Sequence, residues 1–193
     1  VIGLPLGVIL VTGDAGGIRP LPGALMKVLN FVINILRSVP FLILMMMVIP
    51  LSRLIMGTSV GTMALIVPLV IAAAPFVARL VESSLLEVDG GVIEAAQSMG
   101  SSNFQIICKV LIPEAKPSLL VGSAIAITTI LGYTPMTYLV GGGGLGQLAI
   151  QYGIYRSNAT MMYAASLLII LLVQIMQEVL SAVAKKSDKR IRK

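Results

Sequence analysis

The stretch at 94–100 reads Glu-Ala-Ala-Gln-Ser-Met-Gly, and the chain continues to Val-Leu-Ile-Pro at 110–113. It is a modestly polar interlude between long apolar runs. Apolar residues recur through it at three- and four-residue steps, namely at Ile93, Ala96, Met99 or Gly100, Phe104, Ile107 and Leu111. This period predicts an amphipathic helical segment with one apolar stripe. Glu94 and Gln97 fall on the side opposite to the stripe.

Gly100 is expected to break this helical segment in two. Glycine readily adopts the left-handed conformation that closes a helix, and Ser102 with Gln105 matches the capping box that starts a new one. Pro113 is expected to end the second helix because it has no amide hydrogen and its ring clashes with the preceding turn. The pattern therefore predicts a compact helix–turn–helix at the membrane surface. It either docks into a groove on another protein or packs as an ordinary loop helix on its own bundle.

The spacing of this stretch resembles the signature loop of permease subunits of ATP-binding-cassette importers, written E-A-A-x3-G-x9-I-x-L-P. The positions that correspond to the signature are Glu94, Ala95, Ala96, Gly100, Val110, Ile112 and Pro113, with Val110 replacing Ile and Ile112 replacing Leu. The resemblance implies that the loop inserts into a cleft of a cytoplasmic ATPase and transmits its opening and closing to the spans. Glu94 would contact the ATPase surface, and Gly100 would permit the turn. Ala95 and Ala96 would keep the helix thin enough to enter the cleft.

The composition of the chain places it in lipid. Of its 193 residues, 57% are hydrophobic and 11% are charged, whereas soluble domains average about 25% charged residues. Six of the fourteen basic residues lie in 185–193, immediately after an apolar run. This is where the positive-inside rule places basic residues, so the net charge of +6 argues for a membrane protein and against nucleic-acid binding. The single cysteine, Cys108, excludes an internal disulfide.

Hydropathy predicts an all-α membrane protein, a single transmembrane domain over 1–193 with five transmembrane helices. The expected spans are 1–12, 28–50, 60–82, 117–140 and 160–183, and the signature loop occupies 83–115. The first is too short for a membrane crossing of about 20 residues, so it is expected to be the end of a truncated span. A cytoplasmic basic tail puts the loop in the cytoplasm and the amino terminus outside.

The sequence also allows predictions for individual residues within the spans. Arg37 is costly at membrane depth, and it either reaches the cytoplasmic headgroups or takes a direct part in transport. Pro40 is expected to kink its helix. Arg79 and Glu82 are three residues apart and are expected to form an ion pair. The fourth span is rich in small residues such as Gly122, which allow close helix–helix approach.

A glycine-rich run follows the fourth span. Gly141-x-Gly143-x-x-Gly146 formally matches the dinucleotide-binding fingerprint. No βαβ context surrounds it, and the next acidic residue, Glu178, is too distant to fit. We interpret the run as a glycine hinge.

Across nearly the whole chain, the sequence resembles the permease of methionine importers, for example at 37–41, 74–79 and 143–147. The resemblance implies alternating access by a homodimer in the bacterial cytoplasmic membrane, with two ATPase subunits and an extracytoplasmic binding protein. The chain itself would be no enzyme and bind no cofactor, since ATP and Mg are used by the ATPase. Tyr133 and Met136, beside Pro135, are either gate residues or packing residues.

Three other functions remain open on the sequence. A permease for another amino acid or small nutrient would share every coupling feature, and the resemblance leaves L- and D-methionine undistinguished. A channel would need no ATPase. An intramembrane enzyme is the weakest hypothesis because the chain has no histidine and no pair of acidic residues inside a span.

Overall fold

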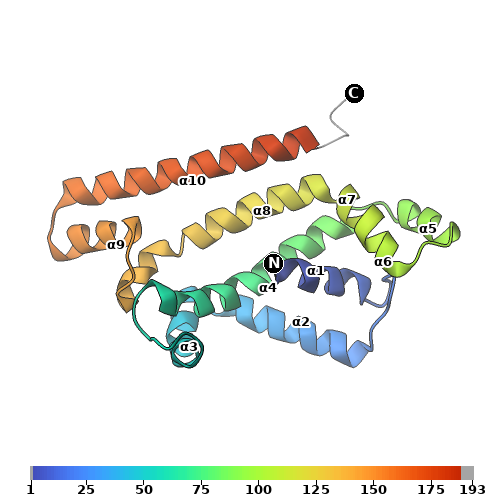
Figure 1. The fold of residues 1–193 in the computed structure, drawn as a ribbon, viewed down its shortest axis with the longest axis horizontal. Helices are drawn as coiled ribbons and strands as arrows, with labels where there is room; N and C mark the ends of the chain where they lie inside the picture. The colour runs from blue at the N-terminus through green and yellow to red at the C-terminus, as the bar shows by residue number, and fades with distance from the viewer. Residues whose placement is uncertain (1, 188–193) are drawn as a thin grey trace. The chain divides into compact units, whose positions relative to one another are not determined.

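The computed structural model describes residues 2–187, and every regular element in that range is helical (Figure 1). The part of the basic tail at 188–193 lies outside the described residues. The α-helices are α1 Gly3–Thr12, α2 Gly23–Ser38, α3 Phe41–Met56, α4 Ile66–Leu86, α5 Gly90–Ser98, α6 Asn103–Ile106, α7 Ile112–Glu114, α8 Lys116–Leu131, α9 Leu145–Ile150 and α10 Ala159–Ser187. Short 3₁₀ helices occupy Thr62–Leu65 and Thr134–Val140, and π turns occupy Ile107–Leu111 and Gln151–Tyr155.

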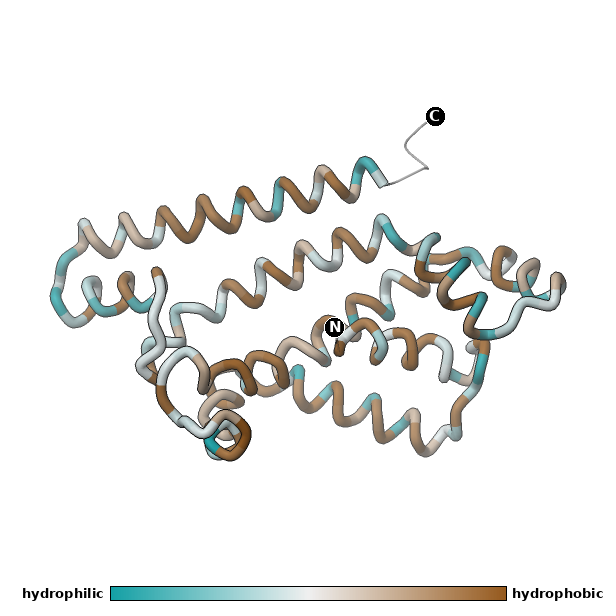
Figure 2. The backbone as a smooth tube through the Cα atoms, in the orientation of Figure 1, coloured by the Kyte–Doolittle hydropathy of each residue, from teal (hydrophilic) through white to brown (hydrophobic). Residues whose placement is uncertain are grey.

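Three helical segments are long and apolar enough to cross a membrane, namely Thr62–Leu86, Lys116–Val140 and Ala159–Ser187. Figure 2 shows hydrophobic residues recurring along α4, α8 and α10. These segments agree closely with the predicted spans 60–82, 117–140 and 160–183. The α2–α3 pair meets the same criterion only when taken together, with a bend of 111° that fits either a broken span or a re-entrant loop, and α1 is a shorter apolar helix. The described chain thus contains up to four complete spans.

The interval predicted as one continuous span, 28–50, is divided in the structure. α2 starts earlier, at Gly23, and stops at Ser38, and α3 begins at Phe41 and continues past Pro50 to Met56. Pro40 lies at the break with φ −56° and ψ 136°, an extended conformation. The expected kink is therefore a full interruption, because Pro also restricts the residue before it to extended conformations.

The described residues form two compact units. The first contains residues 2–35, 74–126 and 179–187, and the second contains 36–73 and 127–178. Helices α4, α8 and α10 each contribute residues to both units.

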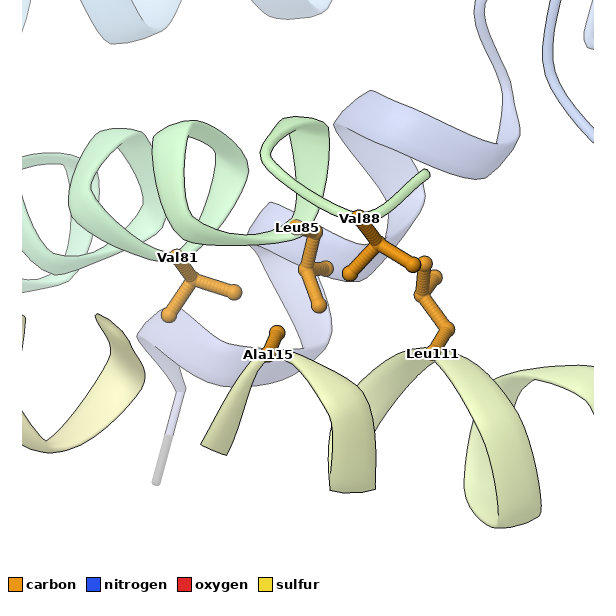
Figure 3. Packing of buried hydrophobic residues seen from close by; sticks show 5 residues of the cluster. All are labelled: Val81, Leu85, Val88, Leu111 and Ala115. Atoms are coloured by element: carbon orange, nitrogen blue, oxygen red, sulfur yellow. The ribbon is translucent and has the colours of Figure 1, made fainter. Parts of the chain in front are cut away.

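The core of the first unit joins α4 to the loop that carries the signature. Val81, Leu85 and Val88 pack against Leu111 and Ala115, and all five are at most 9% exposed. Figure 3 shows side chains from the end of α4 pointing toward those from the loop. Burying a side chain of this size stabilises a protein by roughly 1.5–3 kcal/mol. The loop is therefore held firmly against the end of α4.

Two glycines bring α1 into close contact with α4 in this unit. A Cβ placed on Gly3 would lie 2.5 Å from Val77 Cγ1, and one on Gly7 would lie 2.5 Å from Val81 Cβ and 2.7 Å from the Ala78 carbonyl oxygen. The two glycines are four residues apart, so they share one face of α1. This spacing is typical of small-residue helix contacts in membranes.

A polar cluster joins α2 to α4 in the same unit. Arg79 Nη1 pairs with Glu82 Oε2 at 2.7 Å, which confirms the predicted ion pair. Arg79 Nη2 also donates to Asn30 Oδ1 at 2.7 Å and Asn34 Oδ1 at 2.9 Å. Both charged side chains are only 21% exposed. These contacts compensate the cost of placing a guanidinium group inside a span.

The second unit packs around Phe41, Met45, Leu65 and Val140. Its glycine run has a structural use, since a Cβ on Gly146 would lie 2.7 Å from Pro135 Cα. Gly146 therefore lets α9 pack directly against the Thr134–Val140 helix.

Candidate functional site

The signature stretch forms a hairpin, which we define as residues 89–115. Its first helix, α5, begins at Asp89, whose carboxylate accepts a hydrogen bond from the Gly91 amide at 2.7 Å. Such a cap satisfies one of the free amides at a helix start. Near the other end, the Ser98 hydroxyl donates to the Glu94 carbonyl at 2.9 Å.

The turn of the hairpin is closed by Gly100, as predicted. Its φ is +76°, in the left-handed region. The Gly100 amide donates to the Gln97 carbonyl at 2.9 Å, and the Ser101 amide donates to the Ala96 carbonyl at 3.1 Å. These bonds satisfy carbonyl groups that the end of α5 would otherwise leave free.

The predicted capping box is also present at the start of the second helix. The Ser102 hydroxyl accepts from the Gln105 amide at 3.3 Å, and Gln105 Oε1 accepts from the Ser102 amide at 2.9 Å. The second arm then runs through α6 and a π turn at Ile107–Leu111 to α7.

The expectation that Pro113 ends this helix is wrong. Helix α7 includes Pro113 and ends at Glu114, and α8 begins at Lys116. The Ile112 amide donates to the carbonyl of Ile107, five residues back. Because the π turn closes at Ile112, Pro113 falls in the first turn of a new helical segment, where its missing amide hydrogen leaves no bond unmade.

The predicted apolar stripe is right at Ile93 and Ala96 and partly wrong beyond them. Ala96 is 3% exposed, and Ile93 packs against the core of the first unit. Met99 and Phe104, which the stripe included, are 79% and 74% exposed. Ile106 is fully buried in place of Phe104. The turn at Gly100 resets the helical phase, so a period continued across it selects the wrong face.

The outward side of the hairpin carries both polar and apolar groups. Glu94, Ala95 and Gln97 are exposed, as are Met99 and Phe104. Exposed aromatic and methionine side chains are enriched at the centres of protein–protein interfaces. The inward side is fixed to α4, so the hairpin can contact a partner without losing its own packing.

A cavity of about 550 Å³ lies behind α5 in the first unit. Its lining includes the acidic side chains Asp14, Glu82 and Glu94 and the amides of Asn30 and Gln97. No Lys or Arg belongs to this lining among residues 2–187. Glu94 thus borders both the exposed surface and this cavity, in which the carboxylate of Glu82 is paired with Arg79.

Residues 3–193 match the family described as binding-protein-dependent transport system inner membrane component. The chain belongs to this family. It is 51% identical over 190 residues to the probable D-methionine transport system permease protein MetI of Vibrio cholerae, covering 98% of this chain and 84% of that protein. It is 42% identical over 167 residues to the methionine import system permease protein MetP of Bacillus subtilis, covering 86% and 75%.

A solved structure of the MetNI methionine ABC transporter in an inward-facing conformation has the same fold. The TM-score is 0.93 at 43% sequence identity, and the match covers 97% of this chain and 87% of that chain. The chain is therefore an inner membrane transport component with the type I importer permease fold.

The gate candidates of this transport component lie in different surroundings. Tyr133 stacks on Phe41 with ring centroids 4.3 Å apart and an interplanar angle of 13°. Tyr133 and Met136 both pack, partly buried, against the core of the second unit. Arg37 is exposed in the last turn of α2, where a positive charge is favourable. The structure brings Tyr133 and Met136 to one cluster but leaves Arg37 at the surface.

Two features of the transport component were missed by the sequence reasoning. Asp89 caps α5, and the signal was an Asp followed by two glycines before a helical pattern. Asn30 and Asn34 bind Arg79, and their signal was two amides four residues apart in an otherwise apolar helix. Among residues 2–187, no group of three or more His, Cys, Asp or Glu is arranged to hold a metal ion.

Proposed function

We propose that this chain is the permease subunit of an ATP-driven importer that moves methionine across the cytoplasmic membrane by alternating access. The names of the similar proteins from Vibrio cholerae and Bacillus subtilis support methionine as the substrate. The observation that carries the mechanism is the hairpin at 89–115, which exposes Met99 and Phe104 while its inner face is locked to α4.

The proposed assembly contains two copies of this chain, two ATPase subunits and an extracytoplasmic binding protein. ATP and Mg bind to the ATPase, which performs the hydrolysis, and this chain, one transmembrane domain, binds neither. The hairpin and the carboxyl terminus face the cytoplasm, and the amino terminus faces outside. Lys185 and Lys186 at the end of α10 support this orientation.

Coupling in this proposal is mechanical. Glu94 contacts the ATPase, and Ala95 and Ala96 keep α5 slender. When the ATPase subunits close on ATP, the hairpin moves with them, and Leu111 carries the displacement to Leu85 of α4 because the two side chains share one core. Val110, Ile112 and Pro113 extend this rigid connection to α8.

The gate in this proposal involves Tyr133 and Met136. Their packing against the core of the second unit supports a structural contribution to the gate rather than direct contact with substrate. Arg37, at the surface, is assigned to interaction with lipid headgroups.

Uptake of labelled methionine into proteoliposomes tests this function directly. With the chain, its ATPase and its binding protein reconstituted, we expect accumulation against a gradient that requires ATP hydrolysis. Competition by the other amino acids should be weak. Equilibration of methionine without ATP would instead show a channel, and stronger uptake of another amino acid would reassign the substrate.

Replacing Phe104 with serine tests the docking role of the hairpin. Phe104 is 74% exposed, so the free energy of unfolding should be unchanged. Aromatic side chains at interface centres commonly contribute 2 kcal/mol or more, and every 1.4 kcal/mol is tenfold. We expect the ATPase subunit to bind at least about tenfold more weakly, as measured by titration in detergent. Phe104→Leu is the control and should bind nearly normally, and equal affinity of the serine variant would contradict the assignment.

A further inference from the structure

A second cavity, of about 420 Å³, lies in the first unit where α4 ends, α8 begins and α10 ends. Its lining includes three charged side chains, Glu87 just after α4, Glu114 from the end of α7 and Lys185 from the last turn of α10. Charges of both signs therefore surround one opening. The proposed transport mechanism uses none of these three residues.

The inner part of this cavity is mostly apolar. Val88 and Ala115 are 9% and 3% exposed, and Ala184 is 3% exposed. Ser118 donates to the hydroxyl of Ser84 at 3.1 Å. These two hydroxyls bond to each other, and the polar side chains of the lining that remain for a ligand include Ser181, Glu87 and Lys185.

One wall of the cavity is exposed and apolar. Val121 belongs to the lining and is 49% exposed. It follows Lys116, the first residue of α8, by five residues, which is roughly 7 Å along a helix axis. The expected span 117–140 places Lys116 at the membrane surface, and the headgroup region is about 5–8 Å thick on each side of the hydrocarbon. The cavity thus has a charged rim at headgroup level and an apolar side open at the level of the acyl chains.

We propose that this cavity binds a phospholipid whose headgroup carries a primary ammonium and no other charge besides its phosphate, that is, phosphatidylethanolamine. The ammonium donates to the carboxylate of Glu87, and the phosphate accepts from Lys185. An acyl chain leaves along Val121. A free amino acid would match the two charges but would leave the exposed wall at Val121 without an apolar partner.

The chemistry of the headgroup makes the proposal selective. Phosphatidylcholine has the same phosphate, but its methylated ammonium has no hydrogen to donate to a carboxylate. Phosphatidylglycerol has the phosphate and no cation. Charge-assisted hydrogen bonds are roughly twice as strong as neutral ones, so the ammonium should decide the preference.

Native mass spectrometry of the transporter complex with each lipid added at equal concentration tests the proposal. We expect phosphatidylethanolamine to be retained about tenfold over phosphatidylcholine. Equal retention of the two lipids would overturn the proposal. Stronger retention of phosphatidylglycerol would also overturn it, because that result indicates general attraction to basic residues. Displacement of the lipid by methionine would overturn it in favour of a cargo site.

Three substitutions distinguish the proposed contact with the ammonium from the proposed contact with the phosphate. Glu87→Gln should lower retention of phosphatidylethanolamine to that of phosphatidylcholine, because it removes a carboxylate that only the ammonium uses. Lys185→Gln should lower retention of both lipids, since both carry the phosphate. Lys186→Gln is the matched control, because Lys186 is not part of the lining, and it should change neither. An equal effect of Lys185→Gln and Lys186→Gln would contradict a built site.

Discussion

Replacing Gly100 with valine is expected to abolish substrate-stimulated ATP hydrolysis while leaving the permease in the membrane. Gly100 has φ +76°, and a Cβ there would meet no atom within 4 Å. The effect is therefore conformational rather than steric. The left-handed conformation is unfavourable by about 1–2 kcal/mol for a residue other than glycine, and β-branched residues rarely adopt it. The turn should open and displace α5 from its position for docking.

Gly57→Val is the matched control for Gly100→Val. Gly57 also has a left-handed φ, +74°, and open space around its Cβ position, but it ends α3, far along the chain from the hairpin. Its local strain is the same, so it should leave stimulated hydrolysis intact. Gly100→Asn should retain most activity because Asn tolerates the left-handed conformation. ATP hydrolysis with and without substrate is the measurement. Normal stimulation in Gly100→Val would remove the turn from the coupling mechanism.

Local chemistry made the hairpin predictable from sequence. The turn at Gly100 and the capping box of Ser102 and Gln105 involve hydrogen bonds between residues close together in the sequence. Their conformations therefore follow from residue type alone. The Arg79–Glu82 pair is equally local. The same holds for the long apolar helices, whose lengths are set by the thickness of the bilayer.

Non-local packing was not predictable in this way. The π turn before Pro113 and the burial of Ile106 instead of Phe104 depend on how the second arm meets α4. Asn30 and Asn34 are separated from Arg79 by 49 and 45 positions in the sequence. The residue pattern of one helix does not identify a partner in another helix. The small residues of the fourth span indicated a close helix approach, and Gly122 does lie near Leu80 of α4, but the closer approach of α1 to α4 at Gly3 and Gly7 was not predicted.

Replacing Gly7 with alanine is expected to destabilise the permease by forcing α1 away from α4. A Cβ at Gly7 would lie 2.5 Å from Val81 Cβ and 2.7 Å from the Ala78 carbonyl oxygen. The second neighbour is backbone, so α1 must move away from α4 as a whole. Overpacking of this kind typically costs 1–3 kcal/mol, and we expect about 3 kcal/mol from denaturant unfolding in detergent.

Gly122→Ala is the matched control for Gly7→Ala, because it adds the same methyl group to a helix of the same unit. Its nearest neighbour would be Leu80 Cβ at 3.6 Å, an ordinary contact. Alanine has a helix propensity about 1 kcal/mol better than glycine, so this variant should be as stable as the parent or slightly more so. Equal unfolding free energies for the two variants would show that α1 does not rest on α4 through Gly7. Val81 packs against both α1 and the core that contains Leu111. A lower free energy of unfolding in Gly7→Ala alone would therefore show that the short α1 helix helps to hold the hairpin in place.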